Sequence, residues 1–487
     1  MSHSNFPRGR SGYSRSEALL AERPPPRRIR SGCGTMLRAV GRRNDLWGGL
    51  VVGLVVSGAY SIGAGRAYGL DASVTVHRFV ATSSILDPFD RQVVYNNHVL
   101  FSFIDHLVYS LTANSQEYVL RAVPIAASGL AVGVLAAAVA RRLGWIPALA
   151  AATFIASSPM LILTGREVRG YSLLMLASAL SSVLFVALLR TKQSSQRRIV
   201  VGYVLALALG IGTHLYGLAM VVLHAAAVGD DRAELRRWLP RWMAGSAIGL
   251  ACLVGVASTM IHAHRGRLFR LSFPVDLTET LLGGTWPIVL LVAVPVAVGV
   301  LALRSLMLLR VTLAVLALVL AAWIVGPTDL YPRFFVWLLP GVGLLVGEGV
   351  ARYRSLGLLV GVVVLAQIAR LGPTLTRDDL GNRQAARIAK QVATEGRSPC
   401  ALGGLTAAAM EAYYSPIKVV GLTFRPPACV VVFQLTPGPS AKDVEVPDSW
   451  RAAFPYRTIL DPPSRAVAFS SIRLVYPAVS TAAHHAP

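Results

Sequence analysis

Eleven apolar runs divide this sequence, and most of them are long enough to cross a lipid bilayer as a helix, which takes about 20 residues. They cover residues 46–65, 122–140, 146–163, 172–189, 199–212, 214–228, 243–262, 284–303, 306–325, 334–351 and 355–371. Of the 487 residues, 54% are hydrophobic and only 15% are charged, against about a quarter charged in soluble domains. We therefore predict a polytopic α-helical membrane protein of about eleven spans.

The number of spans depends on the two short runs that flank His214. A single long, tilted helix would also fit there, and it would reverse the topology of everything that follows. Positive charge favours eleven spans, because with a cytoplasmic N-terminus the basic segments "RTKQSSQRR", "DDRAELRRWLPRW" and "ARYRS" all fall in cytoplasmic loops. Residues 46–65 are too long for the core of a signal peptide, so we interpret them as the first span.

The formal net charge of +23 is concentrated in the N-terminal segment and in short loops between apolar runs. This distribution fits the positive-inside rule better than a nucleic-acid partner, and we predict no nucleic acid binding. Residues 1–44 contain ten arginines against two acids, Glu17 and Glu22, among Pro, Gly and Ser. Such a segment buries too little apolar surface to fold, so we predict a disordered cytoplasmic tail that is attracted to membrane lipids.

Two long segments are predicted to lie outside the membrane on the opposite side. The first is an outer loop, 66–118, whose amphipathic stretch "HVLFSFIDHLVYSLT" suits a helix in the membrane interface. The second is 373–487, where helical periodicity in "DDLGNRQAARIAKQVATEG" is followed by the β-rich runs "IKVVGLTF" and "ACVVVFQL". We therefore predict a transmembrane catalytic domain over 45–372 and a small exoplasmic α/β domain over 373–487.

The cysteines leave one pairing open. Cys400 and Cys429 both fall in the predicted C-terminal domain, so they could form a disulfide if that domain faces an oxidising compartment. The alternative is that both are ordinary core residues.

Four polar clusters fall on the predicted outer side of the membrane. They are Asp71 with His77 and Arg78, the segment 87–98, the segment 166–171 in "GREVRGYSLL", and "GTHLYG" at 212–217. Each cluster by itself is typical of an interfacial anchor, but four on one side indicate a site. The carboxylates of Asp71 and Glu167 could take a proton or hold a metal. The guanidiniums of Arg166 and Arg169 could bind a phosphate in a bidentate manner.

Several of these motifs, in their order along the chain, resemble the GT-C superfamily, and most closely its branch of protein O-mannosyltransferases and aminoarabinose transferases. They are the acid after the first span, "NNH" before the amphipathic stretch, "LRAVP", "REVRGYSLL" and "THLYG". The resemblance covers roughly residues 45–225, with weaker agreement at "DLYPRFFVWLLP", 329–340. It implies a cell-membrane glycosyltransferase that moves a sugar, with inversion, from a polyprenyl-phosphate donor to an acceptor hydroxyl. The acceptor would be a cell-envelope glycan, lipid or protein at the outer face.

The resemblance also implies roles for individual residues. Asp71 corresponds to the catalytic acid of the first loop, and Glu167 is the second catalytic candidate. The residues implied in substrate binding are Asn97, His98, Arg166, Arg169, Tyr171, His214 and Arg333. His98 matches the histidine of the family's His-Pro-Pro-Leu stretch, and 166–171 matches its Arg/Glu-Ala-Arg-Pro-Tyr segment.

Three departures from the family pattern bear on these roles. Ala72 stands where many relatives have a second acid, Val99 and Leu100 replace two prolines, and Gly170 replaces another. No cofactor is assigned, and a divalent metal held by Asp71 and Glu167 is an open alternative.

Two other functions share some of these features. A transporter or flippase would also have many spans and a polar cavity, but transporters tend to show inverted repeats, and this sequence has no such symmetry. The long outer loop and the C-terminal domain also favour an enzyme. A non-catalytic relative is the third alternative, because the second acid is absent.

Overall fold

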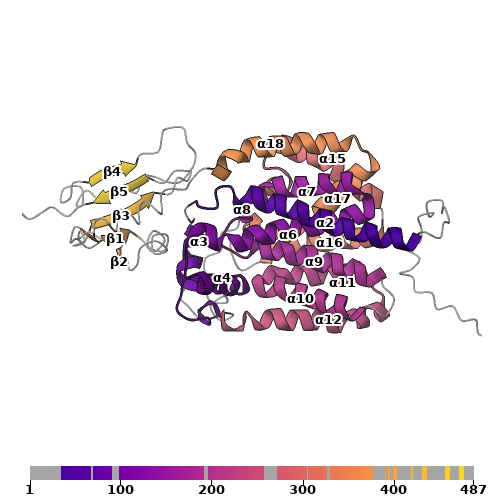
Figure 1. The fold of residues 1–487 in the computed structure, drawn as a ribbon, viewed down its shortest axis with the longest axis horizontal. Coiled ribbons are helices and arrows are strands. Elements are labelled where there is room, and N and C mark those ends of the chain that lie inside the picture. The colour runs from indigo at the N-terminus through magenta and orange to yellow at the C-terminus, as the bar shows by residue number, and fades with distance from the viewer. Residues whose placement is uncertain are drawn as a thin grey trace, which may run out of the picture.

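The computed structural model describes residues 34–66, 68, 70–89, 98–190, 196–256, 271–303, 305–325, 330–376, 390, 393–394 and five strands between 399 and 475. Its main body is a bundle of helices that lie side by side along one direction (Figure 1). The helices are α2 (Gly34–Ser61), α6 (Ala122–Leu143), α7 (Trp145–Ser157), α8 (Pro159–Thr164), α9 (Tyr171–Arg190), α10 (Gln196–Thr213), α11 (Leu218–Val228), α12 (Arg232–Ala251), α15 (Trp286–Leu303), α16 (Leu306–Val325), α17 (Leu339–Arg352) and α18 (Leu356–Thr376). Each predicted span overlaps at least one of these helices.

Five helical segments in the described part of the chain are long and apolar enough to cross a membrane. They are Glu117–Leu143, Tyr171–Arg190, Trp286–Leu303, Leu306–Ile324 and Pro332–Arg352. Two of the other predicted spans are interrupted. The run 146–163 breaks between α7 and α8 at Pro159, which cannot donate a backbone hydrogen bond, and α11 is preceded by a 3₁₀ turn, η4 (Leu215–Gly217). The protein is thus a multi-pass helical membrane protein, and the count of eleven spans stays a prediction.

Two helices begin earlier than the apolar pattern predicts. Helix α2 begins at Gly34, so residues 34–44, which we assigned to a disordered tail, are helical. Helix α12 begins at Arg232, where the Asp231 side chain accepts hydrogen bonds from the backbone N–H groups of Ala233 and Glu234. The apolar pattern marks only the hydrocarbon layer, whereas a helix satisfies its own backbone and can continue into the headgroup region.

Short elements from the predicted outer loop gather at the end of the bundle where α2 ends (Figure 1). They are α3 (Leu70–Thr75), the π-helical turn η1 (Val76–Val80), η2 (Asp87–Phe89), α4 (Val99–Thr112) and α5 (Glu117–Leu120). Helix α4 confirms the helix predicted for the amphipathic stretch. Two further elements, α14 (Phe273–Leu282) and the 3₁₀ segment η5 (Pro332–Leu338), pack against each other and against α8.

A five-stranded mixed sheet lies within the predicted C-terminal domain. Its strands are β1 (Pro399–Leu402), β2 (Lys418–Val420), β3 (Val430–Leu435), β4 (Tyr456–Leu460) and β5 (Ser471–Val475), in the order β2-β1-β3-β5-β4. β1 pairs in parallel with β2 and β3, while β5 is antiparallel to β3 and β4. Most of the predicted helix at 378–396 and Cys429 lie outside the described residues, so the α/β class and the disulfide stay predictions.

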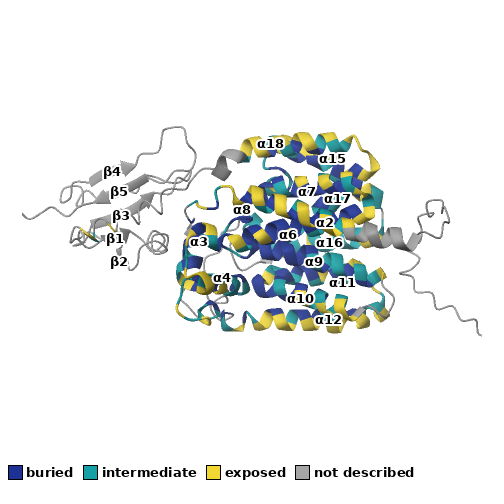
Figure 2. Cartoon of the chain, viewed as in Figure 1, coloured by how far each residue is buried: buried dark blue, intermediate teal, exposed yellow. Residues whose placement is uncertain are grey.

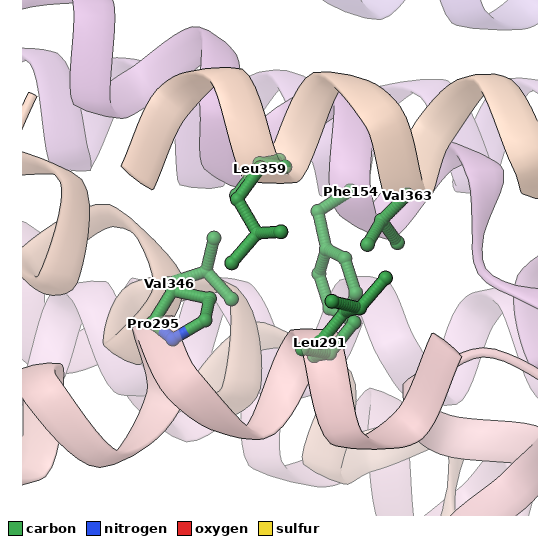
Figure 3. A pocket seen from close by; sticks show the side chains of 8 residues that line it. Phe154, Leu291, Pro295, Val346, Leu359 and Val363 are labelled. Atoms are coloured by element: carbon green, nitrogen blue, oxygen red, sulfur yellow. The ribbon is translucent and has the colours of Figure 1, made fainter. Parts of the chain in front are cut away.

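Burial is greatest in the middle of the bundle, along α6 and α9, and the outer helices α12 and α18 carry many exposed residues (Figure 2). In helix α16, none of the residues in the most apolar stretch of 18 is buried. Its exposed leucines suit contact with lipid, because the hydrocarbon of a bilayer solvates an apolar helix surface. Between α7, α15, α17 and α18 lies a small gap of about 180 Å³, part of which is open to the outside of the bundle (Figure 3). Its lining, which includes Phe154, Pro295 and Val363, is entirely apolar, so we interpret it as a packing gap.

Helices α2 and α6 pack in antiparallel contact through two pairs of glycines. A Cβ atom on Gly53 would lie 2.8 Å from the carbonyl oxygen of Gly129, and one on Gly49 would lie 2.6 Å from that of Gly133. Each helix thus carries its glycines four residues apart, which is the small-residue spacing that lets membrane helices approach closely. This contact fixes the end of α2 from which the chain enters α3.

We expect Gly53→Ala to lower the thermal unfolding midpoint of the detergent-purified protein, because its new methyl group would push α2 away from α6. The control is Gly58→Ala on the same helix, where a Cβ meets nothing within 4 Å. Removing a glycine from an open helical position usually stabilises it by up to about 1 kcal/mol, so this variant should keep or raise the midpoint. Equal midpoints for the two variants would contradict the role of the glycine contact.

Candidate active site

Asp71, in the first turn of α3, lies at the centre of a cluster of charged side chains. Its carboxylate forms an ion pair with Arg169, from the turn between α8 and α9, and accepts a 2.7 Å hydrogen bond from Nη2 of Arg333 in η5. Nη1 of Arg333 lies 4.0 Å from Oε1 of Glu167. The structure therefore brings together four of the predicted site residues from three distant segments.

The two acids of this cluster differ in their surroundings. The side chain of Asp71 is 41% exposed. One of its two oxygens, Oδ2, contacts both Arg169 and Arg333. Glu167 is half-buried, and burial raises its pKa, an effect that Arg333 and Arg169 partly oppose. Among the described residues, Oε2 of Glu167 has no hydrogen-bond partner. Burial therefore makes Glu167 more ready to take up a proton than an exposed glutamate, while Asp71 is in contact with two guanidiniums.

A group of aromatic rings borders the charged cluster. His98, at the start of α4, lies 4.7 Å from the Tyr171 ring and 5.0 Å from the His214 ring, measured between centroids. The guanidinium carbons of Arg169 and Arg333 lie 5.8 and 5.6 Å from the Tyr171 centroid, within cation–π range. Burial, together with Arg169, His214 and Arg333, holds the pKa of His98 well below its usual value, so this imidazole is neutral.

The structure thus brings His98, Tyr171 and His214 together, and their role in substrate binding stays a prediction. Asn97 lies outside the described residues. Asp87, from the same predicted cluster, accepts a 3.2 Å hydrogen bond from the backbone N–H of Ser84 and so stabilises a local turn.

Arg166 lies elsewhere than predicted, because its side chain is directed to the turn that follows α2. Its Nη1 donates a 3.0 Å hydrogen bond to the carbonyl of Ile62, and the residue is buried. Burial, with Arg66 and Arg121 nearby, lowers its pKa to about 10, which still leaves it charged at neutral pH. Neighbouring residues in a tight turn point to different sides, so Arg169 contacts Asp71 while Arg166 does not. Arg166 therefore makes a structural contact, and its role as a phosphate ligand stays a prediction.

Arg121, from the "LRAVP" motif, also has a structural role, which the sequence did not predict. Its Nε donates to the carbonyl of Arg166 at 3.1 Å, and its Nη1 donates to the carbonyls of Ala64, at 2.7 Å, and of Arg66. One buried guanidinium thus connects the turn that carries Glu167 and Arg169 to the segment that leads into Asp71. We call Arg121 and Arg166 the arginine clamp.

Gly170 is explained by close packing at the same turn. A Cβ atom there would lie 2.4 Å from Cγ2 of Thr213 and 3.0 Å from Nδ1 of His98. The proline of the related segments would carry such an atom, so this chain needs glycine where the end of α10 approaches the turn.

Metal binding is not supported by a ready set of ligands. In the described part of the chain, no three His, Cys, Asp or Glu side chains come together as a metal site. Arg333 contacts both Asp71 and Glu167, so a cation at these acids would compete with it. Magnesium can bind through two carboxylates when substrate phosphate supplies further oxygens, so metal use stays a prediction.

Comparison with known proteins identifies the fold. No protein-family model and no curated relative matches the sequence. Among solved structures, ArnT from Cupriavidus metallidurans in the apo state matches with a TM-score of 0.55 and 14% identity, covering 88% of this chain and 97% of ArnT. ArnT bound to undecaprenyl phosphate matches with a TM-score of 0.54 and 14% identity, over 91% and 98% of the two chains. The mycobacterial arabinofuranosyltransferase AftD matches with a TM-score of 0.49 and 14% identity, over 91% of this chain and 40% of AftD.

ArnT is a GT-C aminoarabinose transferase, and the similarity to it extends over nearly its whole length. The chain therefore shares the membrane fold of ArnT, in agreement with the resemblance that the sequence motifs indicated.

The arginine clamp leads to a stability prediction. We expect Arg121→Lys to lower the thermal unfolding midpoint, because an ammonium cannot reach three carbonyls and each buried carbonyl left unpaired costs about 1 to 3 kcal/mol. Arg190→Lys, an exposed change at the end of α9, serves as the control and should leave the midpoint unchanged. A parental midpoint in Arg121→Lys would show that the clamp does not stabilise the fold.

Proposed function

We propose that the protein is a membrane glycosyltransferase that transfers a sugar from a polyprenyl-phosphate donor to an acceptor hydroxyl at the outer face of the membrane. The observation that carries the proposal is the carboxylate of Asp71, held by Arg169 and Arg333 at one end of a membrane helix bundle. The GT-C fold supports it, and so does the binding of undecaprenyl phosphate by ArnT. The acceptor would be a hydroxyl-bearing glycan, lipid or protein of the cell envelope.

The two guanidiniums are the proposed phosphate ligands. Carboxylate and phosphate oxygens are bound by arginine in the same forked geometry. Asp71 therefore occupies the donors that a lipid phosphate would use. When the donor binds, its phosphate competes for Arg169 and Arg333 and releases Asp71 from part of its ion pairing. The same guanidiniums then stabilise the charge that develops on the departing phosphate.

Asp71 is the proposed general base. The acceptor oxygen forms a bond to the anomeric carbon while the bond from that carbon to the phosphate oxygen breaks, and the acceptor proton passes to the Asp71 carboxylate. Polyprenyl phosphate leaves as the anion, and this single displacement inverts the anomeric configuration. Glu167 orients Arg333 and is the rival base. The scheme needs no divalent cation, because guanidiniums neutralise the phosphate.

We expect Asp71→Asn to lower turnover about 10²- to 10⁴-fold at saturating donor, the usual contribution of a general base, while donor binding is retained. The measurement is sugar transfer from polyprenyl-phosphate donors by the purified protein in proteoliposomes. Glu167→Gln should cost less, because that carboxylate acts through Arg333. Near-parental turnover in Asp71→Asn would reject Asp71 as the base, and a larger loss in Glu167→Gln would exchange the two roles.

We expect Arg169→Lys and Arg333→Lys each to raise the dissociation constant for undecaprenyl phosphate, because lysine keeps the charge but loses the planar fork. The matched control is Arg352→Lys at the end of α17, which has an exposed side chain and should leave the constant unchanged. Parental affinity in both site variants would assign the two arginines to holding Asp71 only.

The outer-face orientation has a separate test. Thr112 is exposed at the end of α4, one of the short elements that gather around the site, and Ala233 is exposed at the start of α12, in the predicted cytoplasmic segment "DDRAELRRWLPRW". In a background with Cys33, Cys252, Cys400 and Cys429 changed to Ser, a membrane-impermeant thiol reagent should label Thr112→Cys in intact cells. Ala233→Cys should react only after permeabilisation. The reverse pattern would place the site in the cytoplasm.

A further inference from the structure

Three buried polar groups beside the charged cluster have no hydrogen-bond partner among the described residues. They are the hydroxyl of Tyr171, at the start of α9, the hydroxyl of Thr213, at the end of α10, and Nε2 of His214. Tyr171 and Thr213 are fully buried and His214 is 4% exposed. The rings of Tyr171 and His214 lie 6.1 Å apart between centroids, and Thr213 directly precedes His214 and packs at Gly170, so the three residues lie close together.

The hydrogen-bonding character of each group follows from its surroundings. Nδ1 of His214 accepts a 3.2 Å hydrogen bond from the backbone N–H of Tyr216, so the proton of the neutral ring is on Nε2, which is a donor. The hydroxyls of Tyr171 and Thr213 can each donate and accept. The three groups together offer donors and acceptors but no charge.

Buried polar groups in folded proteins are nearly always paired, because leaving one unpaired costs its full desolvation free energy. Three such groups in one place are therefore expected where a ligand completes the bonding. A ligand that both donates and accepts at neighbouring positions is a polyhydroxyl compound. The sugar of the proposed donor is such a compound, and its phosphate would lie at Arg169 and Arg333, whose guanidiniums approach the Tyr171 ring.

We infer that Tyr171, Thr213 and His214 bind the hydroxyl groups of the donor sugar, and that this sugar is neutral and not an amino sugar. The inference rests on the proposed function and specifies its substrate. It separates this chain from the aminoarabinose transferase ArnT, with which it shares its fold.

The charges around the three groups exclude a cationic sugar. An ammonium group needs acceptors, and preferably a carboxylate, but both nearby acids are in contact with Arg333. Burial also raises the pKa of Glu167, which makes it a weaker partner for a cation. Three arginines, Arg121, Arg169 and Arg333, act on Glu167, and two of them also contact Asp71. An ammonium would therefore enter a region of net positive charge, whereas a hydroxyl would not be repelled.

Sugar binding has a structural requirement, because all three groups are enclosed in the ligand-free protein. Surrounding side chains must move apart to admit the sugar, and the hydrogen bonds then formed offset that cost. In consequence, the three groups should contribute to affinity only when the donor carries a sugar.

Binding of matched lipids to the full chain in nanodiscs at pH 7 tests the choice of sugar. The probes are undecaprenyl phosphate, the same lipid carrying arabinose, mannose or glucose, and the same lipid carrying 4-amino-4-deoxyarabinose. We expect the best neutral donor to bind at least about 10-fold more tightly than undecaprenyl phosphate, a gain equivalent to one to two hydrogen bonds. The amino-sugar donor should bind no more tightly than undecaprenyl phosphate. Equal or tighter binding of the amino-sugar donor, compared with the best neutral one, would overturn the inference.

Two nearly isosteric variants test the residues. Tyr171→Phe and Thr213→Val should each reduce the gain from the neutral sugar about 2- to 10-fold and leave the affinity for undecaprenyl phosphate unchanged. Because both hydroxyls are unpaired without ligand, these variants should keep or raise the ligand-free unfolding midpoint. The control is Ser178→Ala, whose buried hydroxyl donates a 2.8 Å hydrogen bond to the carbonyl of Trp337. It should lower the midpoint and leave the sugar-dependent gain unchanged.

The results separate this inference from the proposed function. The inference would be overturned if Tyr171→Phe and Thr213→Val lost affinity equally for all lipids, or if their unfolding midpoints fell as in Ser178→Ala. Either result would make the two hydroxyls structural. If the parental protein binds undecaprenyl phosphate but gains nothing from any neutral sugar, the inference fails and the proposed function stands. If it binds none of the lipids, the proposed function fails as well.

Discussion

Backbone carbonyls in the turn after α2 are bound by the arginine clamp, and the geometry of the acids depends on this contact. Carbonyl groups at the end of a helix need donors, because the last four have no partner within the helix. Arg121 supplies them to Ala64 and Arg66 while also holding the carbonyl of Arg166. The segment that leads into Asp71 and the turn that carries Glu167 are therefore fixed to one guanidinium. The clamp places the acids without taking part in the chemistry that we propose for them.

The carboxylate of Asp71 is paired with two guanidiniums, whereas the neighbouring Tyr171 and Thr213 carry hydroxyls with no hydrogen-bond partner among the described residues. A buried arginine without an anion is costly, so the resident carboxylates keep Arg169 and Arg333 ordered until a phosphate replaces them. In the described part of the chain, no residue takes the place of a ligand as hydrogen-bond partner for the hydroxyls of Tyr171 and Thr213. The two halves of the proposed donor would thus be recognised differently: the phosphate by exchange for a carboxylate, the sugar by groups left unpaired.

The sequence predicted the helices and the gathering of the polar residues, because apolar length and the position of charges between spans are one-dimensional properties. It did not predict that Arg166 and Arg169 would separate, since both are arginines in the same turn and only the backbone decides their direction. Thr213 was missed for a similar reason. A threonine at the end of a helix is common, and its unpaired hydroxyl is visible only once α10 has been packed against Gly170.

Arg333 shows why the first half of the chain cannot form the site by itself. Its hydrogen bond to Asp71 spans 262 positions in the sequence, and it is the residue that contacts both acids. The element that carries it, η5, is attached to α9 by the hydrogen bond from Ser178 to the carbonyl of Trp337. Because α9 also begins with Tyr171, the sugar-binding hydroxyl and the phosphate-binding guanidinium are positioned from the same helix.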